Sequence, residues 1–330
     1  MTRLKFLALA FVIGSAALAR PAAAEIGVVV TSRPAHAIVA FVMEGVGQPR
    51  LLVERGSLHT FSMRPSDARA VNAADVVFRV SGMLEPFTQR IFASLPERVR
   101  RVTLIEAPGL HLLNRRTGAT FEDHDHAGHD HAHRPAAGHK NQREQKHTHE
   151  HAQPGDRDVD GHVWLDPGNA RAIARHVATV LAQAAPQHAQ RLHANVARFD
   201  AKITTMDAAV AASLASARGR TFVVFHDAFQ YFEAHFGLEA VAAITLTPEL
   251  KPSAARIAQV RRKIAASGAL CVFAEPQFPA RLVETVVEGS RARVAVIDPE
   301  GRTLAPGPGL YFDLMHTLGT EMARCLSPRG

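Results

Sequence analysis

Residues 186–217 read PQHAQRLHANVARFDAKITTMDAAVAASLASA, and this stretch decides how the rest of the chain is arranged. Its apolar side chains recur three and four residues apart, as on one face of a helix: Leu192, Val196, Phe199, Ile203, Met206, Val210 and Leu214. At about 1.5 Å per residue, a helix of this length would extend roughly 48 Å. We therefore expect a stiff helix that runs along two lobes and buries this stripe.

The segments before and after this helix share one pattern of short apolar runs alternating with helical patterns. The runs before it span 25–31, 51–54, 75–80 and 102–106, and those after it span 221–226, 240–246, 270–275 and 293–298. Continuous apolar strands that alternate with helices are typical of parallel sheets covered on both faces. The sequence therefore predicts an α/β fold with two parallel-sheet lobes.

The first 24 residues have the layout of a secretory signal peptide. Arg3 and Lys5 give a basic start, 6–18 is apolar, and three alanines at 22–24 precede Glu25. The apolar run is shorter than the about 20 residues that span a bilayer. We expect residues 1–24 to be removed and the product to be periplasmic.

Composition and charge exclude two broad classes of protein. A chain of 330 residues that is 47% hydrophobic can bury a sizeable core, so disorder throughout is excluded. The formal net charge is +7, and removal of the expected signal peptide takes away three basic residues and no acidic one. The remaining charge of +4 is too small to argue for a nucleic-acid partner.

The chain has two cysteines, Cys271 and Cys325. An even count in an exported protein fits one disulfide, and the alternative is two buried free thiols. A bridge across this separation would tie the last helix to the body of the protein. It would contribute roughly 3 to 4 kcal/mol through the entropy of the unfolded chain.

The segment 121–161 has a different composition from the rest of the chain. It contains no Leu, Ile or Met, so it cannot support a core of its own. Among its acidic residues it holds nine histidines: His124, His126, His129, His131, His133, His139, His147, His149 and His151. This composition favours weak, exchangeable metal binding, and the alternative is a solvated linker that binds nothing.

Side chains able to bind a metal follow the predicted strands. Ligands of open α/β sheets bind beyond the carboxyl ends of the strands, so residues there are the first candidates for a site. Three imidazoles and one carboxylate, the donors of a tetrahedral Zn²⁺ site, come from the two lobes: His59, His162, His226 and Asp298. Each one alone could cap a helix or a turn, or pack in the core. Their joint placement favours a metal site.

Several motifs, taken in order, resemble the metal-receptor family of ABC-transporter solute-binding proteins, and within it the zinc receptors of the ZnuA type. The similarity covers nearly the whole chain after residue 24. It is carried by HTFSMRPSDA at 59–68, the acidic His-rich insert, HVWLDP at 162–167, FVVFHDAFQYFEAHFGL at 222–238, CVFAEPQF at 271–278, IDP at 297–299 and Cys325.

The resemblance implies an α/β fold of two lobes, each a four-stranded parallel sheet flanked by helices, bridged by one long helix with the metal between them. The expected parts are a signal peptide, an N-terminal lobe with a disordered His-rich insert, a linking helix and a C-terminal lobe: 1–24, 25–185 with 121–161, 186–217 and 218–330. The implied function is capture of Zn²⁺ in the periplasm and delivery to a cognate ABC permease in the inner membrane. We expect a monomer that catalyses no reaction.

The resemblance also implies a ligand set. His59, His162 and His226 would bind the zinc ion, and Cys271 and Cys325 would form the disulfide. Some zinc receptors have a glutamate directly before the first ligand histidine, but this chain has Leu58 there. The fourth ligand is therefore either Asp298, which matches a carboxylate of related receptors, or a water molecule.

Two alternatives to a transport receptor remain at this point. One is a periplasmic zinc store or chaperone that serves no permease. The other is a hydrolase or lyase, because three histidines and a water also describe catalytic zinc. Glu275 ends a predicted strand and is the candidate base of such an enzyme, but we interpret it as a buried partner that orients a ligand histidine.

Overall fold

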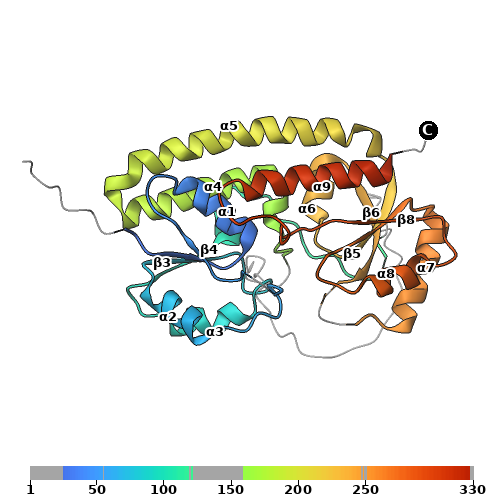
Figure 1. Cartoon of the computed structure of the whole chain (residues 1–330), viewed down its shortest axis with the longest axis horizontal. Coiled ribbons are helices and arrows are strands. Elements are labelled where there is room, and N and C mark those ends of the chain that lie inside the picture. The colour runs from blue at the N-terminus through green and yellow to red at the C-terminus, as the bar shows by residue number, and fades with distance from the viewer. Residues whose placement is uncertain are drawn as a thin grey trace, which may run out of the picture.

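Two four-stranded parallel sheets form the centres of two lobes in the computed structural model, which describes residues 25–54, 56–118, 120–121, 159–246, 248 and 251–327 (Figure 1). The N-terminal sheet has the order β2-β1-β3-β4, with β1 at Val28–Val30, β2 at Arg50–Leu51, β3 at Val76–Arg79 and β4 at Arg100–Thr103. Its connecting helices are α1 at Arg33–Val42, α2 at Pro65–Ala73 and α3 at Phe87–Ser94. A 3₁₀ turn, η1 at Leu104–Glu106, follows β4.

The C-terminal sheet repeats this winding with the order β6-β5-β7-β8. Its strands are β5 at Thr221–His226, β6 at Glu239–Thr245, β7 at Cys271–Ala274 and β8 at Arg293–Val296. Its connecting helices are α6 at Gln230–Phe236, α7 at Ala254–Ser267 and α8 at Ala280–Val287. In both sheets the chain winds first to one side of a central strand and then to the other. Such a reversal leaves a crevice beyond the carboxyl ends of the strands, where ligands bind.

One long helix, α5 at Ala189–Ser213, bridges the lobes as the sequence predicts. It is shorter than the predicted stretch, because 3₁₀ turns at Pro186–His188 and Ala215–Ala217 continue it at both ends. Tightening into 3₁₀ turns is common at helix ends, where the regular backbone partners run out. All seven residues of the predicted apolar stripe are buried.

Helix α5 lies along helices from both lobes (Figure 1). On the N-terminal side α5 contacts α1 and α4, which spans Pro167–Ala184, and on the C-terminal side it contacts α9 at Leu310–Leu326. The sequence analysis did not single out α4. The helix begins after Asp166, whose side chain accepts hydrogen bonds from the N–H groups of Gly168 and Asn169.

Aromatic rings from three helices meet where the lobes join. The ring of Phe199 on α5 lies 5.3 Å from that of Phe41 on α1 and 5.4 Å from that of Phe312 on α9. Gly319 lets α9 approach α5, because a Cβ at this position would lie 2.9 Å from Val210 Cγ1. The lobes are therefore packed against a common apolar surface, which fixes how they face each other.

Hydrogen bonds add further links between the lobes near the strand ends. Trp164 Nε1 donates to the carbonyl oxygen of Pro299 at 2.9 Å, and the Tyr311 hydroxyl donates to the carbonyl oxygen of Trp164 at 3.0 Å. Arg33 Nε donates to the carbonyl oxygen of Gly301 at 3.2 Å.

Two predictions fall outside the described residues, namely the signal peptide at 1–24 and metal binding by the nine histidines between 124 and 151. Within the part of the chain that the structure describes, no helix has both the length and the apolar character that a membrane span requires.

The expected disulfide is confirmed. Cys271 on β7 and Cys325 on α9 are bonded, and their Cα atoms lie 6.2 Å apart. The bond fastens the last helix to the centre of the C-terminal sheet.

Removal of the disulfide should destabilise the protein without changing its fold. We expect the double substitution Cys271→Ser with Cys325→Ser to lower the free energy of unfolding by roughly 3 to 4 kcal/mol, because the unfolded chain regains loop entropy. Denaturant unfolding of both proteins, with and without a reductant, measures this. The reductant should lower the free energy of unfolding of the wild type only. If it lowers that of the double variant by the same amount, the effect does not come from this bond.

Candidate metal centre

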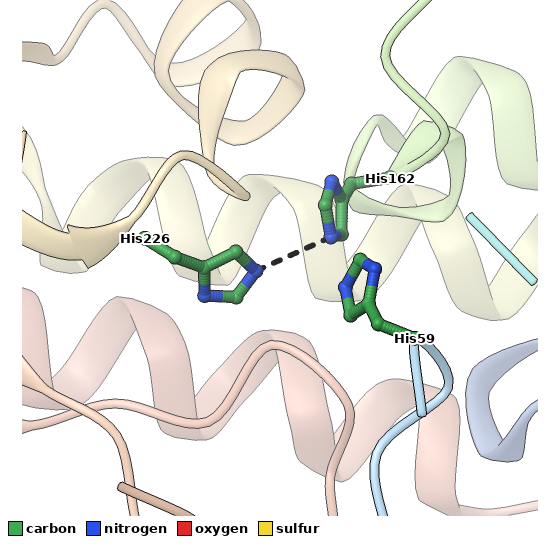
Figure 2. A group of neighbouring side chains, drawn as sticks. All are labelled: His59, His162 and His226. Carbon is green, nitrogen blue, oxygen red and sulfur yellow. Dashed lines mark hydrogen bonds between the residues drawn. The ribbon is translucent and has the colours of Figure 1, made fainter. Parts of the chain in front are cut away.

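Three histidine rings from the two lobes converge at one point (Figure 2). His59, His162 and His226 each offer a nitrogen atom, and these atoms all lie within 4.8 Å of one another. The two Nε2 atoms of His162 and His226 are 3.4 Å apart. Zinc–nitrogen bonds of about 2.0 to 2.1 Å at tetrahedral angles place ligand nitrogens about 3.3 to 3.4 Å apart. The spacing of this pair therefore fits a tetrahedral zinc ion.

Each histidine is held by the buried chain next to it. His226 is the last residue of β5, in the centre of the C-terminal sheet. His162 directly precedes the 3₁₀ turn Val163–Leu165, whose three side chains are buried in the core. His59 lies beyond β2 and follows Leu58, which is only 1% exposed. The position where some zinc receptors have a glutamate is thus part of the core here.

The rings open onto a pocket of about 320 Å³ between the lobes. Leu84 and Pro86 line it from the N-terminal lobe, and Leu246 and Pro248 line it from the C-terminal lobe. Charged side chains also line the pocket, namely Arg115, Arg116, Asp160 and Asp227, so its wall is partly apolar and partly ionic.

Two carboxylates hold the rings in orientation. Val224 on β5 pairs with Phe273 on β7, so the residues two positions further along each strand, His226 and Glu275, also lie side by side. His226 Nδ1 donates to Glu275 Oε1, which is the contact expected for Glu275. His162 Nδ1 likewise contacts Asp160 Oδ1 at 2.7 Å.

Because the Nδ1 atoms face carboxylates, the Nε2 atoms of His162 and His226 are left toward the centre of the group. This is the arrangement of metal-binding histidines, in which a carboxylate fixes the tautomer and raises the basicity of the ligand. Asp160 was not among the residues predicted from the sequence. It could have been found from the sequence as a carboxylate two residues before the candidate ligand His162.

Burial and charge act differently on the pKa values of two of the rings. Burial, together with smaller contributions from positive charge on His226, His162 and Arg115, lowers the pKa of His59 to about 2. Burial also lowers the pKa of His226, but the charge and hydrogen bond of Glu275, with smaller contributions from the charges of Glu300 and Asp227, outweigh it, and the net pKa is raised. His59 is thus a neutral donor at any physiological pH, whereas His226 holds a proton more firmly than an ordinary histidine.

Asp298 is not part of the three-histidine group. Its Oδ1 accepts a hydrogen bond from the N–H of Glu300, and its Oδ2 accepts from the N–H groups of Arg302 and Thr303. In this structure the side chain therefore organises the turn after β8. Its role as a ligand stays a prediction.

Asp227, the residue after His226, belongs to a buried ionic group that was also not predicted from the sequence. Arg116 donates to Asp227 and to Glu233 with a distance of 2.9 Å to each Glu233 oxygen, and its guanidinium lies over the ring of Phe121. Arg116 comes from the segment that leads out of the N-terminal lobe, whereas both acids belong to the C-terminal lobe. These ion pairs therefore link the lobes next to a candidate ligand.

Comparisons with known proteins agree with this architecture. The family described as "Zinc-uptake complex component A periplasmic" matches residues 28–325. The high-affinity zinc uptake system protein ZnuA of Brucella suis is 41% identical over 328 residues, covering 98% of each chain. The protein of that name from Paracoccus denitrificans is 38% identical over 329 residues, covering 99% of each.

Solved structures share the fold at lower sequence identity. A crystal structure of ZnuA matches with a TM-score of 0.70 at 18% identity, covering 92% of this chain and 99% of that one. The laminin-binding protein of Streptococcus agalactiae, described as a bifunctional protein with adhesin and metal-transporting activity, matches with a TM-score of 0.68 at 18% identity, covering 90% and 99%.

Zinc affinity should fall as the pH falls. A proton on His226 competes with the metal, and its raised pKa places this competition above the usual histidine range. Below that pKa we expect the affinity to drop about tenfold per pH unit, with one proton released per ion bound. Zinc titrations across about pH 5.5 to 8.5 measure the slope. An affinity that stays constant between about pH 8 and pH 6 would contradict the competition.

Glu275→Gln should weaken zinc binding without removing a ligand atom. We expect a loss of about 10- to 100-fold near neutral pH, because the carboxylate no longer supports the His226 ring. Burial is then opposed only by the smaller effects of the Glu300 and Asp227 charges, so the pKa of His226 should fall and the pH dependence should shift to lower pH. Metal titration together with NMR titration of the ring measures both effects. Glu284→Gln, an exposed position on α8, is the matched control and should change neither.

Proposed function

The chain belongs to the periplasmic zinc-uptake complex component A family, and we propose that it binds Zn²⁺ at His59, His162 and His226 and delivers the ion to a cognate ABC permease. The observation that carries this proposal is the convergence of three imidazoles from two lobes within 4.8 Å, with the Nε2 atoms of His162 and His226 at the 3.4 Å that suits tetrahedral zinc. The zinc ion is then cargo, and no bond of a substrate is made or broken.

The donor set supports zinc over harder ions. Imidazole nitrogen suits Zn²⁺, whereas Mn²⁺ favours sites richer in carboxylate oxygen. The two carboxylates that contact the rings, Asp160 and Glu275, lie against the Nδ1 atoms and leave the Nε2 atoms as donors. We therefore expect discrimination to rest on nitrogen donors and tetrahedral spacing.

For the fourth position we favour a water molecule. The Asp298 carboxylate accepts three backbone hydrogen bonds, and its movement into the group would break them. A water or hydroxide ligand needs no such rearrangement, and the pocket between the lobes has room for it. Three protein ligands and a water also leave one position open for exchange during transfer.

The location and organisation follow the family. We propose that residues 1–24 direct export and are removed, and that the mature protein is a periplasmic monomer with lobes at 25–185 and 218–330 joined through 186–217. The histidines between 124 and 151 would add weaker sites that collect metal. Because the lobes share one packed junction, release is expected through small movements of lobes or loops.

Zinc titration of the full chain tests the proposed function. We expect one tight site that is lost in His162→Ala and retained within about threefold in Asp298→Asn, since that variant keeps the volume of the side chain. A large loss in Asp298→Asn, with an unchanged unfolding temperature, would instead assign the fourth position to Asp298.

Zinc-limited growth separates delivery from storage. A strain that lacks the native receptor should regain growth with the wild-type chain and not with His162→Ala. Tight binding without restored growth in a strain that keeps the permease would favour a store or chaperone.

A further inference from the structure

The hydroxyl of Tyr231 joins two parts of the chain that lie far apart in the sequence. Tyr231 belongs to α6 in the C-terminal lobe, and its side chain is fully buried. The hydroxyl accepts a hydrogen bond from the N–H of Leu113 at 3.0 Å and donates one to the carbonyl oxygen of Asp160 at 2.9 Å. A side chain of the C-terminal lobe thus holds the backbone of a residue that contacts a candidate ligand.

We propose that Tyr231 is a positioning residue of the three-histidine site, which holds Asp160 in place and through it the ring of His162. The inference rests on the proposed function, because it concerns how firmly the site retains Zn²⁺. Tyr231 supplies no ligand atom. Its effect should therefore appear in the rate at which the ion leaves.

The hydroxyl takes the place of a backbone hydrogen bond between two short segments. Asn114 pairs with Val159 in an antiparallel bridge, and the N–H of Asp160 donates to the carbonyl oxygen of Leu113 at 2.9 Å. In a regular antiparallel pair, two opposite residues exchange both of their N–H···O bonds. Here the second bond, from Leu113 to Asp160, runs through the Tyr231 hydroxyl. A phenylalanine at this position could not complete the pairing.

Asp160 connects this pairing to His162. Its Oδ1 contacts His162 Nδ1 at 2.7 Å and accepts a hydrogen bond from the backbone N–H of His162 at 3.0 Å. The carboxylate therefore holds His162 at two atoms, while the carbonyl oxygen of the same residue is held by Tyr231. A shift of the Asp160 backbone would move the carboxylate that orients the ligand ring.

The stretch of chain that includes Tyr231 also carries a second candidate ligand. His226 ends β5, and α6 with Tyr231 is the next element. This stretch therefore holds His226 directly and His162 through Asp160. The ring centroids of His162 and His226 are 5.3 Å apart, whereas His59 lies 6.2 and 6.1 Å from them. Attachment to one stretch of chain explains why these two rings form the closest pair, with their Nε2 atoms 3.4 Å apart (Figure 2).

Other bonds attach the segment around Arg116 to the C-terminal lobe. Arg116 is held by the ionic group described above, and Gln230 Nε2 donates to the carbonyl oxygen of Asn114 at 2.9 Å. The N–H of Phe121 donates to a backbone carbonyl oxygen of β6 at 2.9 Å. Loss of the tyrosine hydroxyl should therefore leave this segment attached and loosen chiefly Asp160.

Zinc dissociation from a Tyr231→Phe variant of the full chain tests the inference. In every protein compared, the nine histidines between 124 and 151 are changed to Asn, so that release from the weaker sites expected there does not overlap. An excess of a chromogenic zinc chelator removes the ion, and its absorbance gives the rate. We expect dissociation to be about tenfold faster and association to stay within about twofold, because the ligands remain but His162 is held less firmly.

Thr88→Val on α3 is the matched control. The buried Thr88 hydroxyl likewise accepts one hydrogen bond, from Arg79, and donates one to a backbone carbonyl oxygen. We expect its dissociation rate to stay within about twofold of that of the parent protein. An equal rise in both variants would reflect the general loss of a buried hydroxyl and would overturn the inference.

A double-mutant cycle shows whether Tyr231 acts through Asp160. Asp160→Asn should itself speed dissociation about 10- to 100-fold, because the carboxylate that supports His162 is lost. Adding Tyr231→Phe to Asp160→Asn should then change the rate less than twofold, since the hydroxyl no longer has a carboxylate to position. Effects that simply multiply would show two independent contributions and would contradict the proposed role.

The outcome for His162→Ala separates this inference from the proposed function. Tight zinc binding that survives His162→Ala would contradict the proposed transport site itself. If His162→Ala removes tight binding while Tyr231→Phe releases zinc at the parent rate, the transport site stands and only the role of Tyr231 is overturned.

Discussion

The burial of one apolar stripe of α5 against both lobes is the constraint on which the rest of the structure depends. Phe199 contacts Phe41 from one lobe and Phe312 from the other, so neither lobe can rotate without exposing aromatic surface. Burying apolar surface is the dominant favourable term in folding, at about 25 cal/mol per Å². The helix therefore does more than connect two sheets. It sets the distance between strand ends that belong to different lobes.

That fixed junction explains how rings from two lobes meet at one point. His59 and His162 are held by the N-terminal lobe and His226 by β5, yet their nitrogens lie within 4.8 Å of one another. Burial and positive charge on His226 and His162 favour the neutral state of His59. Glu275 acts in the opposite direction on His226. A proton and a cation therefore compete for the group. Such competition suits a receptor that must also release its ion.

Contacts between a histidine ring nitrogen and a carboxylate oxygen recur at three places in the described chain. The pairs of His162 with Asp160, His226 with Glu275 and His235 with Asp207 come from different elements, and each leaves one ring nitrogen for another partner. Arg116 holds two further acids, Asp227 and Glu233, in a buried ionic group. Asp160 and Glu275 each contact a ring nitrogen of the three-histidine group, and Asp227 and Glu233 are held by Arg116.

The sequence by itself determined the elements and the chemistry of the candidate site. The spacing of apolar residues predicted the stripe of α5 and the eight strands, and the location of histidines near strand ends predicted which side chains would lie together. These features are local, since a period of two or of three to four residues is encoded by neighbours along the chain. Three features came only from the tertiary structure. They are the parallel register that sets Glu275 against His226, the backbone hydrogen bonds that Asp298 accepts in the turn after β8, and the contact of His235 with Asp207. Each of these depends on how surfaces distant in sequence pack on one another, and the packing of α5 decides that for both lobes at once.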